Sequence, residues 1–358
     1  MLHVAAVSGL GALTPVTLYT SDLCCNHNPG VKGKLPDGTP NVHPEQVARL
    51  SVLLEAMRGD WKREFGDSLI IEDQREADVT REQLLRVHSE PYIERVERIM
   101  LQAQRAPRKL PDGKLEYMRC NLNSDTVVSH GSQQGVVRAV GLVCAAVDDV
   151  LSSSSREGAD APPRAFVMVR PPGHHACSTT SSGFCVYNNV LVGVAHAQAV
   201  HGIDRVAILD FDVHHGDGDS DISWCDATRL YASSHEAERW PYTGETWGCD
   251  GLHGQIVNCP LPPKSGSAEF RAAWSDTLLP TVRKFEPEAI FLSAGFDAHV
   301  DDPLATMTLV PEDFAWLTTE VAKLGLPIIS VLEGGYNPDA LEVCVKAHLK
   351  ALIHAVAE

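Results

Sequence analysis

The sequence is short of basic residues. It has 30 Lys and Arg against 47 Asp and Glu, which gives a formal net charge of −17. Binding to a nucleic-acid backbone needs clustered Lys and Arg, so this balance argues against a nucleic-acid ligand and fits a cationic substrate or partner better. No basic run typical of a nuclear-import signal is evident either.

The sequence also lacks a cysteine framework and a long apolar run. Its ten cysteines have no regular spacing, and no C-x-x-C pair suggests a structural zinc knuckle. Reduced thiols in the cytoplasm or the nucleus are therefore expected. No apolar run approaches the roughly 20 residues of a membrane span. The apolar start, residues 1–13, lacks the positive charge that opens a signal peptide, so we predict neither a membrane span nor secretion.

The hydrophobic residues, 44% of the chain, are arranged in a pattern typical of an α/β protein. Apolar, β-branched runs that predict strands alternate with segments that predict helices, as in right-handed βαβ units of a mostly parallel sheet. The predicted strands are 16–20, 165–170, 205–212, 289–295 and 327–335, and the helices include 133–151, 187–201 and 311–325. We interpret the Ser-rich stretch 152–163 as a surface loop within one domain, and residues 21–44 as a long loop that could border an active site.

The most informative segment is AILDFDVHHGDG, residues 207–218. It places five side chains that bind metals or handle protons at the end of a predicted buried strand: Asp210, Asp212, His214, His215 and Asp217. If the strand continues through Asp212, period-two alternation sends Asp210, Asp212 and His214 to the same side. Open parallel sheets carry their sites at the carboxyl ends of their strands.

Three further strand ends carry reactive side chains. His174 and His175 follow the strand at 165–170, Asp297 follows 289–295, and Tyr336 follows 327–335. A single Asp at a strand end is usually a turn or a helix cap. Turn chemistry gives no reason for this whole set to recur at successive strand ends, so we predict that the four loops meet at one edge of the sheet.

The residue types divide by chemistry. Asp212, His214 and Asp297 offer two oxygens and one nitrogen to a divalent cation and leave positions open for water and substrate. Zinc is the first choice, with ferrous iron and cobalt as alternatives. His174 and His175 would then move protons, with Asp210 and Asp217 as candidate acceptors behind them.

Tyr336 follows Gly334 and Gly335, which allow the backbone to turn sharply. Its phenol could donate a hydrogen bond to the oxyanion that develops on an attacked carbonyl. Packing of the ring over a glycine turn is the alternative reading of this residue.

At this point the motifs resemble those of the zinc-dependent histone deacetylase superfamily, which includes acetylpolyamine amidohydrolases and acetoin-utilisation proteins. The forms RPPGHHA and GFDAHxxDPL look most like class II members. The resemblance covers nearly the whole chain, through HPEQVARL (43–50), HSEPYIERV (88–96), DTVVSHGS (125–132), RPPGHHA (170–176), GFCVYNNV (183–190), ILDFDVHHGDG (208–218), LSAGFDAHVDDPLATMTL (292–309) and LEGGYNPDAL (332–341).

The resemblance implies a single three-layer α/β/α domain over residues 1–358 with an arginase-type fold. It implies Asp212, His214 and Asp297 as zinc ligands, and His174 and His175 backed by Asp210 and Asp217. It also implies that Tyr336 stabilises the oxyanion. The implied substrate-binding residues are Asp125, Gly183, Phe184, Trp240, Leu304 and Gly335. A structural potassium ion is implied near Asp210, Asp212, His214, Ser233 and Ser234, whereas the altered stretch 219–230 gives no basis for a second one.

The activity so implied is removal of acetyl or other acyl groups from Nε-acyl-lysine, in histone tails or other proteins. The alternative is an acetylpolyamine amidohydrolase, although Leu304 stands where the polyamine-selective branch has a glutamate. A non-catalytic acyl-lysine reader is disfavoured because Tyr336, both histidines and all three ligands are present. Trp240 stands where the family usually has Phe, so the tunnel could differ in shape.

Overall fold

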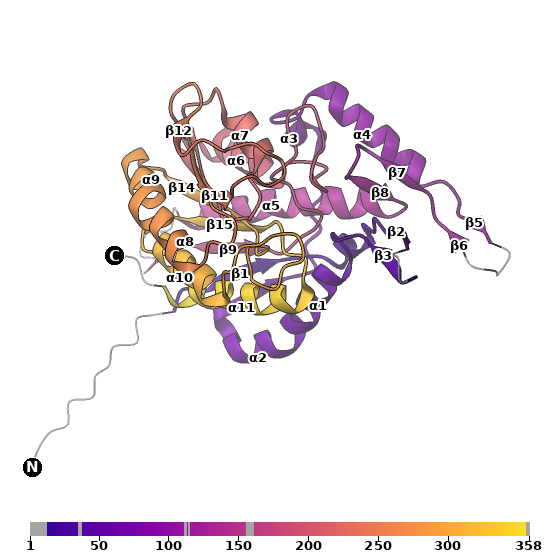
Figure 1. Ribbon diagram of the computed structural model, residues 1–358, viewed down its shortest axis with the longest axis horizontal. Coiled ribbons are helices and arrows are strands. Elements are labelled where there is room, and N and C mark those ends of the chain that lie inside the picture. The colour runs from indigo at the N-terminus through magenta and orange to yellow at the C-terminus, as the bar shows by residue number, and fades with distance from the viewer. Residues whose placement is uncertain (1–12, 35–37, 111–112, 114, 155–160, 356–358) are drawn as a thin grey trace, which may run out of the picture.

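The computed structural model describes residues 13–34, 38–110, 113, 115–154 and 161–355 (Figure 1). Most of the apolar start, residues 1–12, lies outside the described residues. Within the described part of the chain, a nine-stranded sheet forms the centre of the molecule. Its order is β12 (Gly248–Asp250), β13 (Ile256–Leu261), β11 (Arg229–Glu236), β10 (Val206–Asp210), β14 (Ala289–Ala294), β15 (Ile328–Leu332), β9 (Arg164–Val167), β1 (Val16–Tyr19) and β4 (Leu69–Glu72). All pairs are parallel except that of β12 with β13.

Helices cover both faces of this sheet (Figure 1). The helices are α1 (Ala48–Ala56), α2 (Lys62–Phe65), α3 (Arg81–Leu85), α4 (Glu90–Ala103), α5 (Ser132–Ser154), α6 (Asn189–His201), α7 (Asp217–Ser223), α8 (Ser267–Ala273), α9 (Leu279–Phe285), α10 (Pro311–Ala322) and α11 (Pro338–His354). Shorter 3₁₀ or π segments are η1 (Asp22–Asn26), η2 (Met57–Trp61), η3 (Gly66–Ser68) and η4 (Trp274–Leu278). The helices α5 and α6 pack together on one face, and α10 and α11 on the other, which confirms the predicted α/β fold.

The central strands are buried on both faces, as expected for parallel strands between two helical layers. Every residue of β10, β14 and β15 is buried, and their sequences VAILD, AIFLSA and IISVL are almost entirely apolar. Residues at the two ends of α6 determine where this neighbouring helix begins and ends. Asn188 caps α6 by accepting a hydrogen bond from the N–H of Leu191, and Gly202 ends the helix with φ +66°.

Some predicted boundaries differ from the structure. The strand β10 ends at Asp210 rather than Asp212, because Asp210 Oδ1 accepts a hydrogen bond of 3.0 Å from the N–H of Asp212 and the chain turns there. The predicted loop at 152–163 starts too early, since its first three residues belong to α5; residues 155–160 lie outside the described part. The predicted loop 21–44 contains η1 and a hairpin of β2 (Val31–Lys34) and β3 (Pro40–Val42).

Two other small hairpins lie outside the main sheet. They are β5 (Arg108–Lys109) with β6 (Leu115–Glu116), and β7 (Arg119–Asn121) with β8 (Val127–Ser129). None of the helices in the described part of the chain has the length and apolarity that a bilayer crossing requires.

The order of the strands determines which loops lie next to one another at the edge of the sheet. The strands β10, β14, β15 and β9 are consecutive neighbours and all run parallel. Their carboxyl ends therefore lie side by side, and the four loops with the predicted reactive residues leave the same edge.

Candidate active site

Asp212, His214 and Asp297 come together at this edge, with one ligand atom from each within 4.8 Å of the others. His214 Nδ1 lies 3.1 Å from Asp212 Oδ1 and 3.1 Å from Asp297 Oδ2. A tetrahedral zinc ion with ligands at about 2 Å has ligand–ligand distances of about 3.3 Å, so the three atoms fit three corners of such a site. Both carboxylates are completely buried, and no Lys or Arg pairs with either among the described residues. A cation would compensate this buried charge.

Two glycines, Gly295 and Gly334, pack directly against the carboxylates of Asp212 and Asp297. A Cβ atom on Gly295 would lie 2.0 Å from Asp212 Oδ2, and one on Gly334 would lie 2.2 Å from Asp297 Oδ2. Glycine is therefore required at both positions. The N–H of Gly334 donates to Asp212 Oδ2 at 2.8 Å, and the N–H of Val213 donates to Asp297 Oδ1 at 2.9 Å. These bonds fix the direction of both carboxylates.

The first of the two adjacent histidines, His174, is buried against carboxylates. Its Nδ1 donates to Asp210 Oδ2 at 3.1 Å, and the hydroxyl of Tyr231 donates to the same oxygen at 2.9 Å. Burial alone would lower the pKa of His174, but the charges of Asp212 and Asp210 outweigh it and raise this pKa well above its usual range. His174 is therefore suited to carry a positive charge beside the three-residue cluster.

The second histidine, His175, has a different environment. Its Nδ1 lies 2.7 Å from Asp217 Oδ1, and its ring centroid lies 3.9 Å from that of His174. Burial and the neighbouring His174 lower the pKa of His175 to about 4, against the opposing effect of Asp217. A neutral His175 with Nδ1 protonated has Nε2 free to accept a proton, as a general base requires.

Sequence reasoning missed Glu333, which positions the histidine pair. Glu333 is completely buried, and its Oε2 accepts hydrogen bonds from the N–H of Gly173 at 2.6 Å and of His174 at 3.1 Å. Burial raises the pKa of Glu333 to about 7. The available signal was its place directly before Gly334 and Gly335 at the end of β15.

Tyr336 is almost completely buried, and burial raises the pKa of its phenol well above its usual range. The phenol therefore remains a hydrogen-bond donor. Two residues without a predicted role hold it. Asp302 Oδ2 accepts from the Tyr336 N–H at 2.7 Å, and the Arg49 guanidinium carbon lies 4.8 Å from the centre of the Tyr336 ring. Arg49 Nε also donates to the carbonyl of Gly335 at 2.5 Å.

Arg49 is held in place by a buried network of charged side chains that includes Glu45 and Arg170. Glu45 Oε1 accepts from Arg49 Nη1 at 3.3 Å and from Arg170 Nε at 2.6 Å, and all three side chains are buried. Burial would raise the pKa of Glu45, but Arg170, His27 and Arg49 outweigh it and lower this pKa to about 2. The network links HPEQVAR (43–49) to RPPGHHA (170–176), two motifs far apart in the sequence.

A cavity of about 530 Å³ leads to the cluster, a size typical of small-molecule sites. Five of the six predicted substrate-binding residues line it, together with His175, His214 and Tyr336; these five are Asp125, Gly183, Phe184, Trp240 and Leu304. A Cβ on Gly183 would lie 2.3 Å from His175 Cδ2 and 2.6 Å from Trp240 Cη2, so the wall closes only with glycine there. Gly335 is not among the lining residues; it has φ +118° and lies where Arg49 contacts its carbonyl.

The residues implied for potassium have other partners in the structure. Ser233 Oγ lies 2.9 Å from His235 Nδ1, and Ser234 Oγ accepts from Trp274 Nε1 at 2.9 Å. Asp210, Asp212 and His214 all belong to the cluster around the histidine pair. Asp210 and Ser233 are direct neighbours on β10 and β11.

A second group with metal-ligand chemistry is formed by Asp148, His196 and His201 on α5 and α6. Both histidines direct Nε2 at Asp148 Oδ1, each at 2.8 Å. Arg86 Nη1 lies 2.9 Å from His196 Nδ1, and an arginine can only donate, so His196 carries its hydrogen on Nε2. That nitrogen has no lone pair for a metal. This group is therefore a hydrogen-bonded cluster between two helices.

Comparison with known proteins identifies the family of this chain. The family model for the histone deacetylase domain matches residues 43–352. Histone deacetylase 14, chloroplastic, from Arabidopsis thaliana is 33% identical over 87% of this chain and 73% of its own length. Polyamine deacetylase HDAC10 from Homo sapiens is 33% identical over 88% of this chain and 45% of its own length.

Other relatives differ widely in length. Type-2 histone deacetylase 2 from Dictyostelium discoideum is 41% identical over 65% of this chain, which spans only 15% of that relative. Among solved structures, the crystal structure of the HDA15 HD domain superposes with a TM-score of 0.79 at 27% identity and covers 94% of this chain and 90% of its own. The family model covers most of the chain and these relatives match most of its length, so the chain belongs to the histone deacetylase family.

Proposed function

We propose that this chain hydrolyses the amide bond of Nε-acyl-lysine in histones or other proteins, releasing the acid and free lysine. The histone deacetylase family is zinc-dependent in general. We assign Asp212, His214 and Asp297 as the zinc ligands, since their donor atoms fit a tetrahedral ion. We further propose that residues 1–358 form a single catalytic domain.

Zinc bound by these residues would lower the pKa of a water molecule and polarise the acyl carbonyl. His175, neutral and held by Asp217, accepts the proton from the attacking water and returns it to the lysine nitrogen as the amide breaks. His174, held by Asp210, contributes positive charge next to the developing oxyanion. The phenol of Tyr336 donates a hydrogen bond to that oxyanion.

The cavity of about 530 Å³ is called the channel from here on, and its walls support an extended acyl-lysine side chain as the substrate. The Phe184 ring meets the Tyr336 ring edge-on, with centroids 5.8 Å apart, and the Trp240 and His175 ring centroids lie 4.6 Å apart. Asp125 also lines the channel, and we assign it to hold the backbone of the substrate. These apolar walls would exclude water from the reacting amide.

The observation that carries this proposal is the meeting of the buried three-residue cluster, the histidine pair and Tyr336 at the base of one channel. A panel of lysine peptides with short and long acyl groups, assayed on protein of measured zinc content, tests it. Release of free lysine in proportion to bound zinc is expected. A zinc-loaded, folded protein that binds acyl-lysine peptides without cleaving any would instead establish a reader.

The second candidate is an acetylpolyamine amidohydrolase, favoured by the resemblance to the relative named as a polyamine deacetylase. The apolar side chain of Leu304 in the channel wall favours acyl-lysine instead. Comparing hydrolysis of an acetyl-lysine peptide with that of N-acetylputrescine distinguishes the two. A potassium ion near Asp210, Asp212, His214, Ser233 and Ser234, and a location in the cytoplasm or the nucleus, complete the proposal.

A further inference from the structure

The residues that line the channel differ in their exposure to solvent. His175, His214 and Tyr336 are no more than 8% exposed, so they lie at its base. Glu238 and Tyr242 also line the channel and are exposed, Tyr242 by 70%. These two residues therefore lie where the channel opens to solvent, and a peptide whose acyl-lysine reaches the base has to pass them.

The charge of the lining residues is negative at this opening. Arg239 is the one Lys or Arg among the described residues that line the channel, and its charge is already paired. Its Nε lies 2.9 Å from Glu236 Oε2, its Nη2 donates to Glu236 Oε1 at 2.9 Å, and its Nη1 donates to the carbonyl of Leu304 at 2.6 Å. Neither Glu238 nor Asp125 forms an ion pair with a Lys or Arg in the part of the chain that the structure describes. Their two negative charges therefore remain available to a substrate.

The backbone holds Glu238 and Tyr242 in an unusual conformation. Their φ angles are +57° and +61°, in the left-handed region that residues other than glycine rarely adopt. Such a conformation persists only where the surrounding structure fixes it. The N–H of Glu238 donates to Glu245 Oε1 at 2.9 Å, and the N–H of Tyr242 donates to the carbonyl of Arg239 at 2.7 Å. One short segment thus presents a carboxylate and an aromatic ring at the opening.

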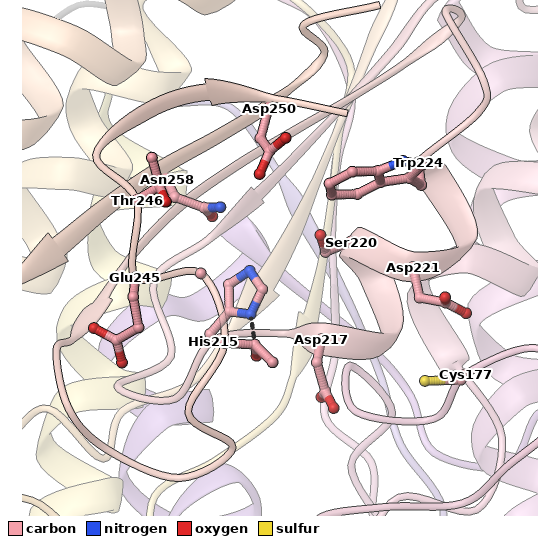
Figure 2. Close-up of a pocket in the computed structure, with 12 residues that line it drawn as sticks. Cys177, His215, Asp217, Ser220, Asp221, Trp224, Glu245, Thr246, Asp250 and Asn258 are labelled. Carbon is pink, nitrogen blue, oxygen red and sulfur yellow. Dashed lines mark hydrogen bonds between the residues drawn. The ribbon is translucent and has the colours of Figure 1, made fainter. Parts of the chain in front are cut away.

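The loop that carries Glu245 is itself anchored to the strands of the site. His215 Nδ1 lies 2.8 Å from Thr243 Oγ1, the hydrogen bond drawn as a dashed line in Figure 2. His235 Nε2 donates to the carbonyl of Gly244 at 3.1 Å. A Cβ on Gly244 would lie 2.5 Å from His215 Cδ2, so the loop packs directly against this ring. The support for Glu238 is therefore fixed by residues of the fold before any substrate arrives.

We propose that Glu238 makes the channel selective for acyl-lysines that have a positively charged side chain next to them in the peptide. A guanidinium or ammonium group at that place gains an ion pair with Glu238 and a contact with the ring face of Tyr242. The formal net charge of −17 adds a longer-range attraction for basic peptides. A neutral neighbour gains none of these interactions, and an acidic neighbour is repelled. This inference rests on the proposed function, because it names which acyl-lysines the same channel prefers.

Three short peptides that differ only in the residues on both sides of a central acetyl-lysine test the proposal. These residues are Arg, Gln or Glu, and kcat/KM is measured for each peptide on the zinc-loaded full chain. The unaltered protein should prefer the Arg peptide to the Gln peptide by about five- to tenfold, the range expected for an exposed ion pair with an added aromatic contact. The Glu peptide should be the poorest substrate. High salt should reduce the preference, since exposed charges are screened.

The key variant is Glu238→Gln, which removes the charge and keeps the size of the side chain. Its ratio of kcat/KM for the Arg peptide to that for the Gln peptide should fall about threefold. Tyr242→Leu should also lower this ratio. The matched control is Glu286→Gln, which removes an equal charge from an exposed residue just before β14, at the opposite edge of the sheet, and should keep the ratio of the unaltered protein.

Binding of the same peptides, followed by fluorescence anisotropy, separates this inference from the proposed function. Hydrolysis of all three peptides at equal kcat/KM would overturn the selectivity and leave the function standing. Tighter binding of the Arg peptide, lost in Glu238→Gln but without hydrolysis, would support the selectivity and refute the function. An unchanged ratio in Glu238→Gln, or an equal fall in Glu286→Gln, would overturn the role of Glu238. Failure of all three peptides to bind would overturn both proposals.

Discussion

Asp302 accepts a 2.7 Å hydrogen bond from the backbone N–H of Tyr336, and its other oxygen accepts one of 2.9 Å from the N–H of Leu304. One carboxylate therefore joins Tyr336, the proposed oxyanion donor, to Leu304 in the channel wall. Asp302→Ala should lower kcat about tenfold with little change in KM, because losing such bonds displaces the phenol by a small distance. Asp302→Asn, which keeps an acceptor, should restore most of kcat. A raised KM with unchanged kcat would show that Asp302 acts on substrate binding instead.

Tyr336→Phe removes the hydroxyl alone and keeps the ring between Phe184 and Arg49. We expect kcat on an acetyl-lysine peptide to fall by about 10²- to 10³-fold, the usual effect of losing one oxyanion donor. Zinc content should stay the same, because Tyr336 is not among the predicted ligands. An unchanged kcat would contradict the assigned role of this residue.

Chelation of the metal should abolish hydrolysis and lower the Tm, because Asp212 and Asp297 are buried side by side and no Lys or Arg among the described residues pairs with them. Addition of zinc should restore both. Metal analysis should give one zinc per chain in the unaltered protein and far less in Asp297→Asn. Asp148→Asn in the cluster between α5 and α6 is the control and should keep its zinc; a loss there would refute our interpretation of that cluster.

His348 predicts a pH dependence of stability away from the active site. It is buried between Thr318 Oγ1 at 2.7 Å and Ser330 Oγ at 2.9 Å, and burial lowers its pKa from 6.5 to about 3. The unfolded chain therefore binds a proton below pH 6.5 that the folded chain does not bind until about pH 3. Stability is lost as pH falls through this window, by about 1.4 kcal/mol per pH unit for this group.

Urea unfolding at pH 7.0 and 5.5 measures this loss. In His348→Gln the decrease in unfolding free energy between the two values should be smaller by about 1 kcal/mol, even if the variant is less stable overall. Equal decreases in both proteins would assign the acid sensitivity to other buried groups.

Leu304→Glu tests substrate choice in the channel. The backbone of Leu304 is fixed, since its carbonyl accepts from Arg239 Nη1 at 2.6 Å, so the change should alter charge without moving the wall. The ratio of kcat/KM for N-acetylputrescine to that for an acetyl-lysine peptide should rise about tenfold or more. Leu304→Gln is the neutral control and should leave the ratio near its original value.

The edge of the sheet that carries the site could be predicted because the signal is local. Each of the four strands is an apolar run that ends in a reactive residue, and parallel strands bring such ends together. The roles of Glu333, Asp302 and Arg49 could not be predicted in this way. Arg49 Nε reaches the carbonyl of Gly335 across 286 residues of sequence, and no periodicity encodes such a contact.

The length of β10 was wrong for a related reason. Alternation predicted a strand through Asp212, but the side chain of Asp210 bonds to the next-but-one N–H and ends the strand. Asp212 and His214 therefore meet through a turn and not through strand pleating. The Asp210 side chain competes with the neighbouring strand for the N–H of Asp212, and this competition ends the strand at Asp210.

Gly295 and Gly334 leave no space for even a methyl group behind the paired carboxylates. Main chain, and not side-chain packing, therefore sets how deep an ion can lie beneath the rim. The depth of the channel at this point is therefore fixed by the backbone, and side-chain substitutions elsewhere would not change it. A change in the length of the acyl group that this channel accepts would then have to arise from its walls, where Trp240 and Leu304 lie.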